Sequence, residues 1–154
     1  MALKIFEILE NYELAISKLY KIYSQRCPEY SKFWDHISKD EEEHASWLRS
    51  LAALVKNGIL EFDSTRFRLK AIETSLSYVY ELQEKAKNSN PDMVKFLSTA
   101  IDLENSIIEK KFYTVIADED PDFRKTFSEL SKGAETHYKA VKGLRDRIIK
   151  ERNS

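Results

Sequence analysis

Two seven-residue stretches of the chain each end in a histidine and have the same residue at four matching positions. SKDEEEH covers residues 38–44 and SKGAETH covers residues 131–137. In the first stretch Glu41 and His44 are three residues apart, so a helix would place a carboxylate and an imidazole on one face, one turn apart. Carboxylate oxygens with neutral imidazole nitrogens suit iron or manganese. The spacing therefore predicts a pair of metal ligands on one helix.

The second stretch differs from the first at three positions, and one of these differences removes a potential ligand. An ungapped comparison of residues 28–44 with residues 121–137 matches Pro, Lys, Ser, Lys, Glu and His, which indicates an internal repeat. Ala134 stands at the place of Glu41 and offers no ligand atom. Glu135 is turned about 100° around the helix from that place. The repeat predicts one complete Glu-x-x-His motif and one that lacks its glutamate.

The helices that must position these residues follow from apolar residues at intervals of three and four, interrupted by Pro, Gly and Asp clusters. With 3 Gly, 3 Pro and 42% hydrophobic residues among 154, the chain is expected to be all-α. Two antiparallel hairpins of long helices, joined by a long crossover that contains a short extra helix, predict a four-helix bundle in a single domain, residues 1–154. The expected helices cover about 3–25, 28–57, 69–88, 91–116 and 121–150.

Each of the four long helices carries at least one potential ligand in its apolar row. The rows contain no Lys or Arg, so a buried carboxylate there needs protonation or a metal ion. A di-iron or di-manganese carboxylate centre takes a Glu from each of two helices and a Glu-x-x-His from each of two others. Five of those six places are filled, by Glu13, Glu41, His44, Glu104 and His137.

Other interpretations of the same residues stay open. The run DEEEH could be a solvated turn, and His137 could be a core histidine bonded to a carbonyl or a buried Glu. Glu13 competes with a second plausible core stripe on the same helix, made of Tyr12, Ile16, Leu19 and Tyr23. Tyr20 is either a core aromatic or a hydrogen-bond donor that orients a ligand carboxylate.

The two halves of the chain resemble a rubrerythrin-like, ferritin-like domain. The front half has Glu13, Tyr20 and then EEEHASWL, and the back half has AIDLENSIIEKKFY followed by LSKGAETHYKAV. The resemblance covers nearly the whole chain and implies a di-iron centre that acts on peroxide, oxygen or ferrous iron. It implies that the metal ligands are Glu13, Glu41, His44, Glu104 and His137, with Glu41 or Glu104 bridging two metals. A homodimer is common among such bundles.

Two departures limit what the resemblance transfers. Ala134 removes a ligand, so one iron, manganese or zinc in place of two irons stays open, with Glu109 as a substitute carboxylate. Cys27 is the only cysteine, which rules out the cysteine cluster of an attached rubredoxin domain, so electrons would come from a separate donor protein. A bundle that has lost its metal and serves as an interaction or dimerisation module is the alternative function.

Composition excludes several other partners. The net charge is −1 with acidic and basic residues interspersed, so the basic patch of a nucleic-acid binder is missing. No uninterrupted apolar run approaches the ~18 residues of a membrane span, and charges interrupt the first sixteen residues as they would not in a signal peptide. A cytoplasmic protein without nucleic-acid or membrane partners is expected.

Overall fold

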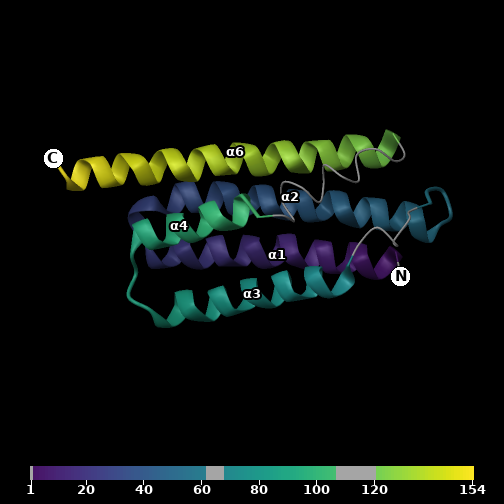
Figure 1. Ribbon diagram of the computed structural model, residues 1–154, viewed down its shortest axis with the longest axis horizontal. Coiled ribbons are helices and arrows are strands. Elements are labelled where there is room, and N and C mark those ends of the chain that lie inside the picture. The colour runs from purple at the N-terminus through teal and green to yellow at the C-terminus, as the bar shows by residue number, and fades with distance from the viewer. Residues whose placement is uncertain (1, 62–67, 107–120) are drawn as a thin grey trace. The chain divides into compact units, whose positions relative to one another are not determined.

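The computed structural model describes residues 2–61, 68–106 and 121–154 (Figure 1). Within these ranges all regular structure is helical and no strand occurs, which confirms the expectation of an all-α chain. No helix in these ranges has the length and apolar character needed to cross a membrane. The elements are α1 (Ala2–Arg26), the 3₁₀ turn η1 (Pro28–Tyr30), α2 (Ser31–Lys56), α3 (Leu69–Asn88), α4 (Met93–Glu104) and α6 (Pro121–Arg152).

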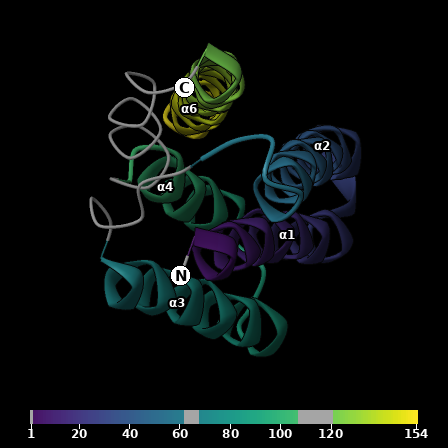
Figure 2. The ribbon, with the colours of Figure 1, turned by 90° about the vertical axis from the view of Figure 1, so that its right-hand side faces the viewer.

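The chain divides into two compact units, Met1–Asn90 and Pro91–Ser154. In the first unit α1 packs against α2 on one side and against α3 on the other (Figure 2). The helices α1 and α2 run antiparallel and form the first predicted hairpin (Figure 1). In the second unit α4 packs against α6. That residues 1–154 form a single domain stays a prediction.

The position of α1 between two helices explains why its sequence offers two apolar stripes. Leu9, Glu13, Ile16 and Tyr20 form one row, and every member is buried. The competing stripe is buried as well, namely Tyr12, Ile16, Leu19 and Tyr23. The two interpretations of α1 were therefore not exclusive, because a helix with neighbours on two sides buries more than one face.

Both ends of α2 follow the expected signals. Pro28 opens the 3₁₀ turn that leads into the helix, and Asn57 forms the C-cap. Gly58 has φ +73° and donates its N–H to the carbonyl of Val55 at 3.1 Å. The N–H of Ile59 reaches the carbonyl of Leu54 at 2.9 Å, which completes a Schellman motif.

The helix expected from about 91 to 116 is shorter than predicted. Asp92 caps its start by accepting hydrogen bonds from the backbone N–H groups of Val94 and Lys95. It ends at Glu104, with Asn105 as the C-cap. The prediction that this helix continues through Asn105 was therefore wrong. The rest of the predicted helix and the substitute ligand Glu109 lie outside the described residues.

Candidate metal centre

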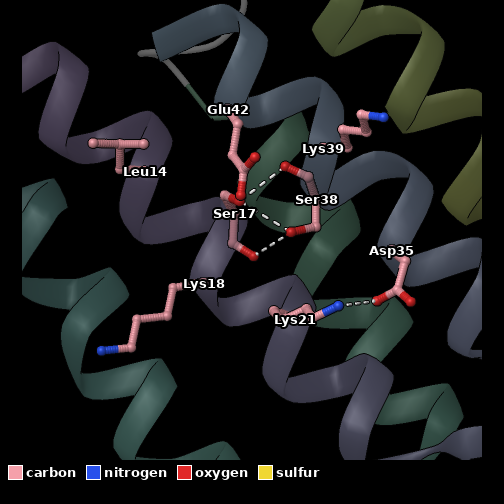
Figure 3. A pocket seen from close by; sticks show the side chains of 8 residues that line it. All are labelled: Leu14, Ser17, Lys18, Lys21, Asp35, Ser38, Lys39 and Glu42. Atoms are coloured by element: carbon pink, nitrogen blue, oxygen red, sulfur yellow. Dashed lines mark hydrogen bonds and ion pairs between the residues drawn. The ribbon is translucent and has the colours of Figure 1, made fainter. Parts of the chain in front are cut away.

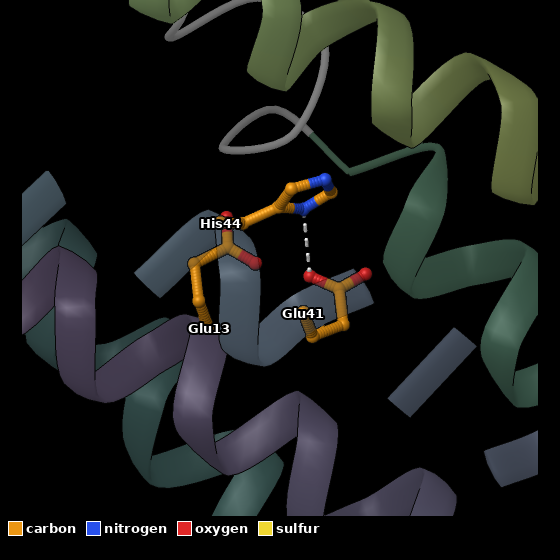
Figure 4. Close-up of side chains that lie close together, drawn as sticks. All are labelled: Glu13, Glu41 and His44. Carbon is orange, nitrogen blue, oxygen red and sulfur yellow. Dashed lines mark hydrogen bonds and ion pairs between the residues drawn. The ribbon is translucent and has the colours of Figure 1, made fainter. Parts of the chain in front are cut away.

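Glu13, Glu41 and His44 converge in the first unit (Figure 4). Each offers a ligand atom that lies within 4.8 Å of the other two. The glutamates are fully buried, and the histidine is 5% exposed. His44 Nδ1 lies 3.2 Å from Glu41 Oε2. Of the five predicted ligands, these three are brought together within one unit, which we call the hairpin cluster.

Two helices position the hairpin cluster. Glu41 and His44 face the interior because the apolar row of α2 places them between Ile37 and Leu48, both buried. The helical turn alone sets their mutual spacing. Glu13 comes from the antiparallel α1 and reaches the pair across the α1–α2 interface (Figure 4). The run DEEEH is thus not a solvated turn. It lies within α2, where Glu41 and His44 are buried and the two glutamates between them are exposed.

The donor set of the hairpin cluster fits a metal ion. Ligand atoms about 2.1 Å from an ion lie about 3.0 Å from their neighbours in octahedral coordination and about 3.4 Å from them in tetrahedral coordination. The 3.2 Å separation of His44 Nδ1 and Glu41 Oε2 already matches neighbouring ligands. Two carboxylates and one imidazole suit iron, manganese or zinc. These residues could therefore hold a metal ion with small side-chain adjustments.

The charges of the hairpin cluster favour a cation. Among the described residues, the buried polar side chains include no Lys and no Arg. Two carboxylates removed from water cost several kcal/mol each unless a positive charge compensates them. A proton on His44 would compensate one negative charge, whereas a divalent ion compensates both and keeps the imidazole neutral.

Trp47 lies beside His44 of the hairpin cluster, at a position that the spacing of potential ligands did not predict to be functional. Its ring centroid lies 5.1 Å from that of His44, and the side chain is half-buried. The signal was present in the sequence, because residues three apart share a helix face. An indole next to a candidate ligand makes a natural optical reporter of this position.

The remaining predicted ligands form a pair in the second unit. Glu104 Oε1 on α4 lies 3.4 Å from His137 Nδ1 on α6, and both side chains are buried. The predicted row of α6 is buried at all eight positions, namely Phe123, Phe127, Leu130, Ala134, His137, Val141, Leu144 and Ile148. Ala134 therefore faces inward without a ligand atom, while Glu135 is half-buried.

Tyr20 is fully buried on α1, and its ring packs against Trp34 with centroids 5.4 Å apart and against Tyr23 at 6.3 Å. Its place as a core aromatic is confirmed, whereas a hydrogen bond from it to a ligand stays a prediction. His36, which lies off the apolar row, is exposed, and its Nε2 lies 3.7 Å from Oδ2 of Asp40.

No known protein family, curated protein or solved structure matches the chain. The rubrerythrin-like resemblance rests on the residues and their spacing. What the structure adds is an all-helical arrangement, within the described ranges, and a buried carboxylate–histidine cluster able to hold a metal ion.

Proposed function

We propose that the chain is a non-haem di-iron, or iron–manganese, protein of the rubrerythrin-like class with a ferritin-like arrangement of its helices. It would act on hydrogen peroxide, oxygen or ferrous iron. One observation carries the proposal, namely the convergence of buried Glu13, Glu41 and His44 within 4.8 Å. The buried pair of Glu104 and His137 supports it by offering the same donor types from the second unit.

In such a centre the glutamates and the histidines would have different roles. Carboxylates from Glu13, Glu41 and Glu104 would compensate three of the four positive charges of two divalent ions. His44 and His137 would bind as neutral imidazoles. Because Ala134 withholds the fourth carboxylate, one positive charge would remain for an external ligand such as hydroperoxide or hydroxide. When bound, two ferrous ions supply one electron each, so one hydrogen peroxide and two protons become two waters.

A mononuclear site on the hairpin cluster is the second candidate. The observation that favours it is that all three ligand atoms come from the unit Met1–Asn90. Such a site would be complete without Glu104 and His137. Zinc or a single iron would suit it, with water in the remaining positions.

The decisive experiment is iron bound per chain after anaerobic loading with Fe(II) and desalting. Wild type is compared with His44→Ala, His137→Ala and the matched control Glu42→Gln, which changes an exposed glutamate next to Glu41. The di-iron proposal expects about two irons in wild type and in the control, and fewer in both histidine variants. Oxidation of the loaded protein by one equivalent of peroxide should then follow.

The other outcomes separate the alternatives. About one iron, lost in His44→Ala and kept in His137→Ala, would establish the mononuclear site in place of the di-iron centre. No iron in wild type would overturn metal binding and leave a helical scaffold that acts through interactions with other proteins.

A further inference from the structure

Ser17 of α1 and Ser38 of α2 form a reciprocal hydrogen-bonded contact, here called the serine bridge (Figure 3). The Ser17 hydroxyl donates to the backbone carbonyl of Ser38 at 2.8 Å. The Ser38 hydroxyl donates to the carbonyl of Ser17, also at 2.8 Å. The two hydroxyl oxygens are 3.0 Å apart, and both residues are buried.

The serine bridge differs from the contacts of three other helical serines, which bond within their own helix. Ser50, Ser75 and Ser98 each donate to the carbonyl four positions earlier in their own helix. That local bond satisfies the hydroxyl without any neighbouring helix. In the bridge both hydroxyls instead reach the neighbouring backbone, which requires the helices to approach closely and in one register. Two buried donors lose their partners if the register changes.

The serine bridge lies one helical turn from the hairpin cluster on both helices. Ser17 follows Glu13 by four residues, and Ser38 precedes Glu41 by three. Glu41 and His44 need no help in finding each other, because a single helix sets their spacing. Glu13 must be placed by the α1–α2 register. A shift of α1 by one turn would move it about 5.4 Å, more than the 4.8 Å that encloses the three ligand atoms.

We infer that Ser17 and Ser38 are positioning residues that hold Glu13 in ligand geometry against Glu41 and His44. This inference rests on the proposed metal binding by the hairpin cluster. Removing the bridge loosens the third ligand and leaves the intrahelical pair in place.

The chain contains a matched control one heptad away. Ser24 of α1 is buried and donates to the carbonyl of Ser31, at the start of α2, at 3.3 Å. It makes the same kind of contact between the same helices, seven residues farther from Glu13 than Ser17 is. Both bridge serines line a groove of about 510 Å³ (Figure 3). Alanine favours helix at both positions, so the alanine variants are expected to fold.

The test is the Kd for Co(II), followed by visible absorption, in wild type, in the double variant Ser17→Ala/Ser38→Ala, and in Ser24→Ala. The double variant should bind about tenfold more weakly, the scale expected for residues that orient metal ligands. Ser24→Ala should stay within about twofold of wild type. Circular dichroism confirms folding, and Ser38→Ala alone, with an intermediate loss, decides the matter if the double variant does not fold.

A second comparison separates positioning from general loosening. In a Glu13→Gln background, removal of the serine bridge should weaken Co(II) binding no further, because the bridge acts through Glu13. An equal loss in both backgrounds would overturn the inference, as would an unchanged Kd in the serine variants. Wild type that binds no Co(II) would instead refute the proposed metal binding itself.

Discussion

At the scale of single residues, the most informative feature is a pair of polar side chains inside an apolar row. Glu41 and His44 are buried between Ile37 and Leu48 on one face of α2. Because their spacing is set within one helix, the sequence alone predicted the pair. Their burial removes the interpretation as a solvated charge run and leaves compensation by a proton or a metal ion.

A bound open-shell ion should quench the fluorescence of Trp47, whose ring contacts that of His44. Titration with Co(II) should lower the tryptophan emission of wild type, and most of the decrease should be absent in Trp47→Phe. The remaining emission comes from buried Trp34. Equal fractional quenching in wild type and Trp47→Phe would show that the ion binds away from His44.

At the scale of elements, two exposed glycines provide opposite tests of how the helices are built. Gly58 ends α2 with φ +73°, whereas Gly143 lies inside α6, and a Cβ at either position would meet nothing within 4 Å. Gly58→Ala should therefore destabilise the protein by about 1 kcal/mol through backbone strain alone. Gly143→Ala should stabilise it by about 0.5–1 kcal/mol.

Urea unfolding followed by circular dichroism measures both changes against wild type. Effects of the same sign would contradict the prediction, since it depends only on backbone conformation. An unchanged free energy of unfolding in Gly58→Ala would mean that the end of α2 contributes little to the stability of the first unit.

The ends of a helix could be predicted where Pro or Gly residues mark them. They could not be predicted where the sequence carries no such signal. Pro28 and Asn57-Gly58 delimit α2 as expected. Nothing comparable stands at Asn105, where Ile107 and Ile108 continue the apolar spacing, so the end of α4 was missed. The serine bridge was missed because a helical serine is compatible with an exposed position, and only the register of α1 against α2 reveals its partner.

At the scale of the whole molecule, each compact unit carries one buried carboxylate–histidine set. The internal repeat predicted that Ala134 of the second copy faces inward at the place of Glu41, and its burial confirms this. What periodicity along one helix could not predict is that three potential ligand atoms of the first unit lie within 4.8 Å of one another. That depends on Glu13 crossing from α1, hence on tertiary packing and not on spacing along one helix.

Metal binding to the folded state should raise the stability of the protein as a whole. An ion at 100 times its Kd adds about 2.7 kcal/mol to the free energy of unfolding, or about 5–10 °C in Tm. Co(II) at that excess should produce this shift in wild type and in the control Glu42→Gln, but not in His44→Ala. A shift that persists in His44→Ala would place the stabilising ion elsewhere.

The position of the hairpin cluster along the chain has a consequence for biosynthesis. Glu13, Glu41 and His44 all precede the first residue of the second unit, Pro91. A ribosome therefore releases every ligand of this cluster before α4 and α6 have been made, and domains generally fold from the N-terminal side during synthesis. If the hairpin cluster binds a metal ion as proposed, the metal supply during translation, and not only after it, would influence which ion the first unit takes up.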